Sequence, residues 1–251
     1  MSLATLPTRR DEAWRYADMD AVARLGVNAL DQWRTIAVSA GENLRQCFIV
    51  GSDTPELHRL RVTLGEGAHA AFFVTNAGQD YTRVEIEVLL ARGAHFEFGG
   101  VTIGGGTATR EFVTKVIHAE PEATSNQTVR AVHWNTGAGN FLGEIKVARH
   151  AQKTDAAQDF KALLLEAGAS ANAVPQLEIF ADDVKCAHGA TVGALDEAAR
   201  FYMMARGLDP ARAQRLLVQA FIGDAFVALD DAAEHERLLE TALAALEGAR
   251  L

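Results

Sequence analysis

Apolar and polar residues alternate strictly in two stretches of the chain, Leu60-Arg61-Val62-Thr63-Leu64 and Val84-Glu85-Ile86-Glu87-Val88. A period of two is typical of a β-strand that buries one face and exposes the other. Further strands are centred near Phe73 and Glu97, so one strand recurs roughly every 12 residues, and pairs such as Gly67-Ala68 separate them. This spacing suits a sandwich, a barrel or a solenoid with two strands per coil of about 24 residues, and it does not choose among them.

The chain changes character twice. Before the strands, residues 9–36 are rich in Ala, Arg and aromatic residues, and a short helix is predicted at Arg9–Tyr16, with Thr8 as its N-cap and Asp11 as a capping-box partner. The strand-like pattern runs from about residue 44 to 193. We therefore expect an N-terminal helical segment (1–43), a β core (44–194) and a C-terminal helical domain (195–251).

The C-terminal domain is predicted to contain three helices. Asp196 can cap the first, and Asp209 can cap the second with Pro210 at its first position. The third is expected to begin at Asp230-Asp231. The predicted apolar positions are Leu217, Phe221, Ala225 and Leu229 on the second helix and Leu238, Leu239, Leu243 and Leu246 on the third.

Composition limits the classes of protein and partner. The 251 residues are 49% hydrophobic and 23% charged, as in an ordinary soluble globular protein. No apolar run is long enough for a transmembrane helix, and residues 1–10 lack the apolar region of a secretory signal, so a cytoplasmic location is expected. The net charge is −9 without a dense basic cluster, which argues against nucleic acid or an anionic membrane as the main partner.

Several common catalytic motifs are missing from the sequence. Gly104-Gly105-Gly106 is a glycine-rich turn, but no Gly-Lys-Ser/Thr follows, so it does not form a phosphate-binding loop. There is no Gly-x-Ser-x-Gly or His-Glu-x-x-His motif. The histidines of the strand region are expected to be hydrogen-bonded or solvent-facing: His58, His69, His95, His118 and His133.

Cys186 and His188 form the sharpest constellation. Residues two apart on a strand point the same way, so a thiol and an imidazole would be presented together. This donor pair suits iron, zinc or copper(I), but a closed metal site takes about four ligands, and Cys47 is the only other thiol. The pair would be half of a site that another chain completes; the alternative is a small apolar thiol beside a hydrogen-bonded histidine.

Three parts of the chain resemble the SufB/SufD family of scaffold proteins in the SUF iron–sulfur cluster assembly machinery, most closely its SufD-type members. The resemblance is carried by Pro7–Tyr16, by Lys153–Gln158, Lys161–Leu165, Pro175–Ile179 and Asp182–Gly193, and by Phe201–Gly207. It implies a right-handed parallel β-helix core with a short N-terminal helical segment and a C-terminal α-helical domain. In the family a SufD-type chain pairs end to end with a SufB-type paralogue, and each binds a SufC-type ATPase.

The resemblance also implies roles for particular residues. It places His188 and, second to it, Cys186 at the cluster-assembly interface, with a transient iron–sulfur cluster there and no cofactor stably held by the isolated chain. It assigns ATPase docking to the C-terminal helices, where Phe201, Tyr202, Arg206 and Leu208 are the candidate contacts; alternatively, the two aromatic residues pack on the neighbouring helix.

Two departures from the family pattern matter. SufB-type chains usually have His-Glu-Ala-Thr where this sequence has His188-Gly189-Ala190-Thr191, which removes a carboxylate and favours the SufD type. The chain is also short for the family, and it has no ATP-binding motif. We expect a non-catalytic scaffold; the alternatives are a metal-binding enzyme of cupin or β-helix type, which needs at least three clustered ligands, and a homodimeric binding module.

Overall fold

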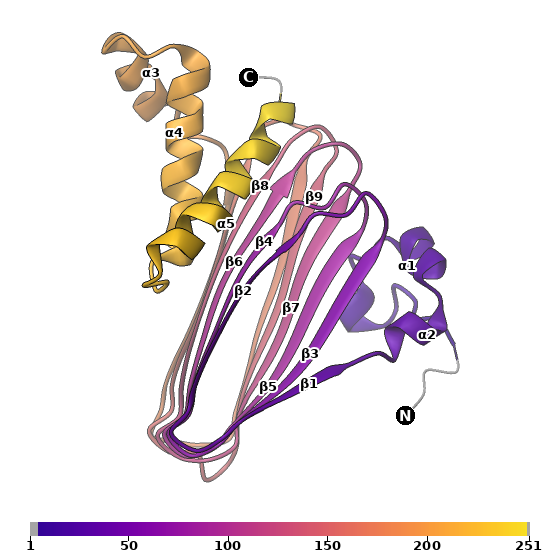
Figure 1. The fold of residues 1–251 in the computed structure, drawn as a ribbon, viewed down its shortest axis with the longest axis vertical. Coiled ribbons are helices and arrows are strands. Elements are labelled where there is room, and N and C mark those ends of the chain that lie inside the picture. Colours follow the sequence, from indigo (N-terminus) through magenta and orange to yellow (C-terminus); the bar gives the residue numbers. More distant parts are fainter. Residues whose placement is uncertain (1–4, 250–251) are drawn as a thin grey trace.

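The computed structural model describes residues 5–249 and shows twelve parallel strands wound into a β-helix (Figure 1). Each coil contributes one strand to each of two facing sheets. The odd sheet has the order β1-β3-β5-β7-β9-β11, and the even sheet has the order β12-β10-β8-β6-β4-β2. The predicted parallel β-helix with C-terminal helices is confirmed.

The strands lengthen along the solenoid. The odd sheet contains β1 (Arg34–Val38), β3 (Glu56–Leu64), β5 (Thr82–Leu90), β7 (Thr109–His118), β9 (Ala138–Val147) and β11 (Ser170–Ile179); the even sheet contains β2 (Asn43–Val50), β4 (His69–Asn76), β6 (His95–Gly104), β8 (Thr124–His133), β10 (Asp155–Leu164) and β12 (Lys185–Gly193). Hydrogen-bonded side chains on adjacent coils of the odd sheet are separated by 26 positions in the sequence for Arg59 and Glu85. The separation grows to 32 positions for Asn140 and Asn172. The coils are therefore longer than the 24 residues expected from the strand spacing.

The solenoid also begins earlier than expected. β1 starts at Arg34, where a helical segment was predicted up to residue 43, and it pairs in parallel with β3 from Arg34 opposite Leu60. As the first strand of its sheet, β1 leaves most of its residues exposed or half-buried. The alternating pattern that marks the later strands is consequently weak here, since no earlier coil covers this one.

Aromatic side chains fill the space between the two sheets. Phe98 and Phe112 meet edge to face with ring centres 5.3 Å apart, and Phe141 and Phe160 stack at 5.9 Å. All four rings are essentially fully buried. A shift of one residue in any strand would turn its apolar set outward, so this core fixes the register of the coils.

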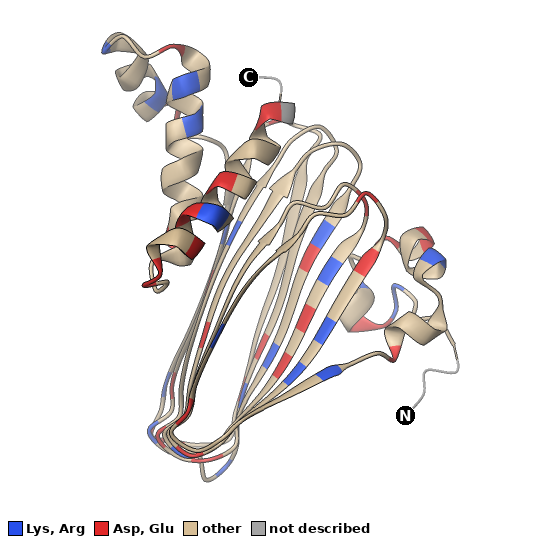
Figure 2. Ribbon diagram, viewed as in Figure 1, with Lys and Arg blue, Asp and Glu red and all other residues tan. Residues whose placement is uncertain are grey.

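Charges of opposite sign alternate between coils on the outer face of the odd sheet (Figure 2). Arg61 bonds Glu87 at 2.8 Å, and Lys115 bonds Glu144 at 2.9 Å. Glu87 and Lys115 are also partners in the register of β5 and β7, so the alternation is continuous over four coils. Each exposed pair contributes only about 0.2–1 kcal/mol, but like charges at these positions would oppose the observed register.

Three short helices pack on that same outer face: η1 (Glu12–Trp14), α1 (Met19–Leu25) and α2 (Val27–Leu30). Trp14 lies over the guanidinium of Arg83 at 4.0 Å, and Arg83 donates to the carbonyl of Ala13 at 2.7 Å. The helix predicted at Arg9–Tyr16 is only one 3-10 turn, and Trp14 is its single buried residue. Its N-cap is Asp11 and not the predicted Thr8, but the expected contact between the two residues forms, because the Asp11 carboxylate accepts from the Thr8 amide at 2.7 Å.

The C-terminal helices are α3 (Glu197–Ala205), α4 (Pro210–Gly223), η2 (Asp224–Phe226), α5 (Ala232–Ala245) and η3 (Leu246–Gly248). Asp196 and Asp209 cap α3 and α4 as predicted, and Asp231 caps α5. None of the helices in the described part is long and apolar enough to cross a membrane.

The apolar face predicted for the second helix is partly right, since Ala225 and Leu229 are buried. The buried apolar residues of α4 include Val218 and Ile222, while Leu217 and Phe221 are half-buried. α4 ends at Gly223, so Ala225 lies in the turn η2 and Leu229 lies beyond it, although both were predicted on the helix. α5 follows the prediction and covers the outer face of the even sheet, where its Leu238 carbonyl accepts from Thr75 at 2.9 Å.

Candidate functional site

Cys186 and His188 lie on β12, the last strand of the even sheet. β12 pairs with β10 on one side, with Cys186 opposite Ala156 and His188 opposite Gln158. On its other side no strand of residues 5–249 follows. Half of the backbone amide and carbonyl groups of β12 are thus directed away from the solenoid, at an edge that can pair with another strand.

Both side chains belong to the face of β12 that continues the interior of the solenoid. Cys186 is half-buried against a small apolar cluster that includes Ile145, Val147 and Ala156. His188 is two residues further on and therefore on the same face, about 6.6 Å along the strand. It is exposed because no further coil within residues 5–249 covers it. The predicted pairing of thiol and imidazole on one face is consistent with this arrangement.

A row of polar residues leads from the interior to His188. Gln127, Gln158 and His188 are register partners on β8, β10 and β12. The Gln158 amide donates to the carbonyls of Gly143 and Gln176, both at 3.3 Å. The amide group of Gln127 is fully buried and has no hydrogen-bond partner among the described residues. The end of the solenoid that carries His188 is therefore more polar inside than its aromatic middle.

The Cys186 thiol is held in its neutral form. Burial raises its pKa above the ordinary value, and the nearby carboxylate of Asp155 raises it further. A thiolate is the form that binds metals and attacks electrophiles. Cys186 therefore becomes a good ligand only when a bound metal or another positive charge favours loss of its proton.

Cys47 does not join this site. It lies on β2, at the opposite edge of the even sheet from β12, and both cysteines are free. With four strands between them, the two edges are roughly 24 Å apart. Within residues 5–249, no group of three or more His, Cys, Asp or Glu side chains is placed to hold a metal ion.

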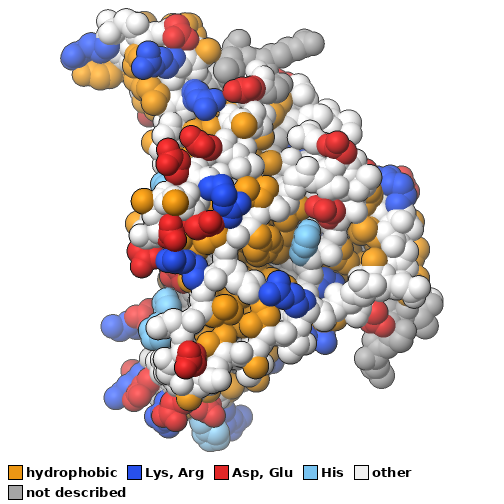
Figure 3. Space-filling view, viewed as in Figure 1, with side chains coloured by type: hydrophobic (Ala, Val, Ile, Leu, Met, Phe, Trp, Pro, Cys, Tyr) orange, Lys and Arg blue, Asp and Glu red, His pale blue; other side chains and the backbone are white. Residues whose placement is uncertain are grey.

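The other sequence-predicted residues lie on the projecting α3 and just after it. Phe201 and Tyr202 are 72% and 59% exposed, and α3 buries none of its residues. The aromatic side chains therefore do not pack on the neighbouring helix, which was the alternative. The Arg206 guanidinium lies 4.9 Å from the Tyr202 ring centre, and Leu208 is half-buried. Apolar side chains gather on this projecting unit (Figure 3).

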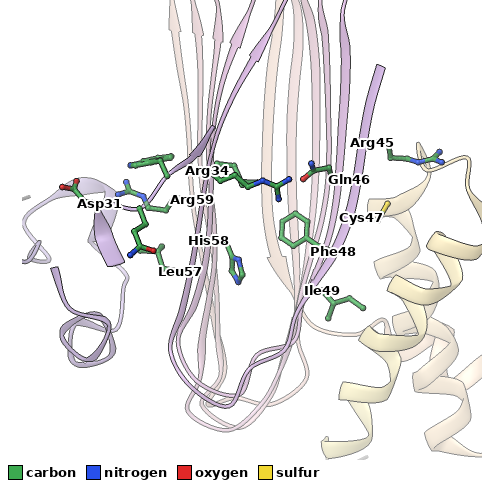
Figure 4. Close-up of a pocket in the computed structure, with 13 residues that line it drawn as sticks. Asp31, Arg34, Arg45, Gln46, Cys47, Phe48, Ile49, Leu57, His58 and Arg59 are labelled. Carbon is green, nitrogen blue, oxygen red and sulfur yellow. The ribbon is translucent and has the colours of Figure 1, made fainter. Parts of the chain in front are cut away.

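A cavity of about 1030 Å³ opens at the first coil, far from β12. Arg34 from β1 and Gln46 from β2 point toward one another across it, with Phe48 and His58 beside them (Figure 4). Trp33 lies at its rim and packs against the guanidinium of Arg59 at 3.8 Å. Sequence reasoning missed this cavity, because its lining comes from separate strands and contains no motif.

The buried histidines have structural hydrogen bonds, as expected. His118 bonds Ser125 at 3.0 Å, and His133 bonds Thr102 at 3.1 Å. Burial lowers the pKa of His118 to about 4 and that of His133 to about 3. Both are therefore neutral near pH 7 and lie inside the solenoid.

A solenoid of stacked parallel coils, with an open last edge bearing a thiol and an imidazole, defines a parallel β-helix class of protein. The family described as "SUF system FeS cluster assembly, SufBD core domain" matches residues 21–221, so the chain belongs to the SufB/SufD family.

Curated relatives agree with this assignment. The chain is 38% identical to the "Iron-sulfur cluster assembly protein SufD" of Escherichia coli over 122 residues, which are 49% of this chain and 29% of that protein. It is 40% identical to "Protein ABCI7, chloroplastic" of Arabidopsis thaliana over 45% of this chain and 24% of that protein. A SufD protein of Bacillus subtilis is 31% identical over 53% of this chain and 31% of its own length. The chain thus matches less than a third of the length of each of these relatives.

The environment of Cys186 predicts its reactivity. In a Cys47→Ala background, alkylation of Cys186 by iodoacetamide should require a higher pH than alkylation of a free cysteine. Asp155→Asn should shift the pH–rate profile to lower pH, because it removes the negative charge that opposes thiolate formation. The size of the shift is expected to be less than half of the total, since burial is the larger cause. A profile unchanged by Asp155→Asn would contradict this description of the site.

Proposed function

We propose that this chain is a non-catalytic scaffold subunit of an iron–sulfur cluster assembly complex, in which it pairs with a SufB-type paralogue and a SufC-type ATPase. The observation that carries the proposal is the open edge of β12, which presents Cys186 and His188 as two metal donors without further ligands in the described chain. Family membership and the names of the relatives, which are iron–sulfur assembly proteins, support it.

The edge favours a partner that is itself a β-strand. A strand added to β12 would satisfy the outward-directed backbone groups and continue the solenoid across the junction. Exposed apolar residues near this end, Ile179, Phe180 and Val192, would be covered at the same time. The partner would then stand opposite Cys186 and His188 and could complete their coordination.

The chemistry of the two donors suits iron and sulfide as cargo. Thiolate and imidazole are both iron ligands, and the imidazole of His188 can also accept a proton. Cys186 stays protonated until a metal arrives, because burial and Asp155 raise its pKa. Such a half-site would let a cluster assemble at the junction and leave again.

Anaerobic affinity purification from the native host tests the function and the site together. The tagged wild-type chain should bring down a SufB-type paralogue and a SufC-type ATPase, with iron and sulfide. His188→Ala should retain both proteins but lose most of the iron and sulfide, since it removes one donor from an exposed position and no packing from the core.

The matched control is His150→Ala, an exposed histidine outside the edge strand, which should behave as wild type. Recovery of the wild-type chain alone or as a homodimer, with its own stoichiometric metal, would overturn the proposal. Full iron and sulfide in the His188→Ala complex would remove His188 from the site.

The α3 patch, formed by Phe201, Tyr202, Arg206 and Leu208, is the proposed docking surface for the ATPase. Its aromatic and guanidinium groups are exposed, and such groups are common binding hot spots. Phe201→Ala should weaken ATPase binding about 30-fold, the equivalent of a 2 kcal/mol hot spot, as measured by titration calorimetry. Arg206→Glu should weaken it as well.

Val227→Ala provides the control, because Val227 is also apolar and 78% exposed but lies beyond α4 and off the patch. Equal affinities for Phe201→Ala and Val227→Ala would place the ATPase elsewhere.

A further inference from the structure

Three large arginines are almost completely buried within the described residues: Arg83, Arg110 and Arg130. Two of them form ion pairs with carboxylates. Arg83 pairs with Glu85 and Glu111, and Arg130 pairs with Asp159 and Asp224. Arg110 differs, because Nε, Nη1 and Nη2 all lack a hydrogen-bond partner within residues 5–249.

Arg110 lies near the start of β7 and points into the solenoid. It is the register partner of Thr82 on β5 and Gly139 on β9, and it lies two residues before the interior residue Phe112, on the same face of the strand. Its exposed fraction is 0%, so bulk water does not solvate the guanidinium. The group is therefore enclosed between the two sheets.

The glycine-rich turn provides the space for this guanidinium. A Cβ placed on Gly104 would lie 2.2 Å from Nη2 of Arg110, and Gly104 has φ of +150°. On the facing side, a Cβ on Gly139 would lie 2.1 Å from Nε2 of His133. Of the Gly104-Gly105-Gly106 turn, Gly104 thus makes room for the buried guanidinium.

The neighbouring polar groups are neutral and bond to one another. His133 Nδ1 lies 2.9 Å from the Gly104 carbonyl and Nε2 lies 3.1 Å from Thr102 Oγ1, so the ring donates to the carbonyl and accepts from the hydroxyl. Thr82 Oγ1 donates to Asn76 at 2.6 Å. No carboxylate bonds to Arg110 among the described residues.

An enclosed cation without a counter-charge is energetically costly. Burying an ion costs free energy even after the protein relaxes around it. Burial lowers the pKa of Arg110 to about 10, so the guanidinium still carries its charge at neutral pH. The positive charge of Arg110 is therefore not balanced by any side chain within residues 5–249.

We propose that Arg110 anchors an internal binding site for a small monovalent inorganic anion of halide size, enclosed between β6, β7, β8 and β9. The planar guanidinium has five N–H donors in a fixed arrangement, so two of them on one edge can bond the same anion. Complete burial selects a small anion over a phosphate, which would need more donors. The anion would balance the charge of Arg110 inside the coils. The site is independent of the half-site on β12.

Bromide is the probe for this site. Crystals of the full chain grown with bromide as the sole halide should show anomalous bromine scattering within hydrogen-bonding reach of the Arg110 guanidinium. In solution at constant ionic strength, replacing gluconate with bromide should raise the wild-type Tm by roughly 5 °C in a saturable manner. Arg110→Met, which removes the charge and keeps a long apolar side chain, should show no saturable rise.

Arg92→Met is the matched control, since Arg92 is exposed and pairs only loosely with Glu122 at 3.8 Å; it should keep the wild-type response. Ordered water alone beside Arg110 in the bromide crystals would overturn the proposal. An identical bromide response in wild type and Arg110→Met would overturn it too. If Arg110→Met fails to fold, the wild-type crystal still decides.

Discussion

Hydrogen bonding between successive coils is the constraint on which this structure depends. In a parallel β-helix, each strand satisfies its backbone with the strands one coil before and one coil after, so only the first and last coils retain free edges. Here those edges belong to β1 and β2 at one end and to β11 and β12 at the other. At the end of the solenoid formed by β1 and β2, α5 packs on the outer face of the even sheet, and its Arg237 donates to the Cys47 carbonyl of β2 at 3.2 Å. The described chain does not continue the last coil, and this is where Cys186 and His188 lie.

The buried arginines connect this architecture to its attached helices. Arg83 ties the N-terminal helices to the odd sheet through the Ala13 carbonyl. Arg130, on β8, bonds Asp159 on β10 at 2.5 Å and Asp224 in η2 at 3.0 Å. Because β10 is the neighbour of β12, a single buried side chain links the C-terminal helical unit to the strand beside the open edge.

The sequence predicts the periodic parts of the molecule well. Strict alternation at Leu60–Leu64 marked β3, and the aspartates before α3 and α4 marked their first residues, because both features act locally. The short β1 and the end of α4 at Gly223 were missed, since edge exposure and a helix stop depend on tertiary contacts.

The candidate site also has features that the sequence predicts and features that it does not. Cys186 and His188 could be paired from their spacing alone, whereas the free edge beside them and the missing counter-charge of Arg110 depend on which coils stack together.

Hydrogen–deuterium exchange on β12 tests the central proposal, that a second chain pairs with this edge, most directly. In the isolated chain the outward-directed amides of residues 185–193 should exchange rapidly, while those of β10, paired on both sides, exchange slowly. Addition of the SufB-type paralogue should slow the β12 amides at least tenfold and leave β10 unchanged. Unchanged exchange on β12 in a complex that demonstrably forms would contradict the account.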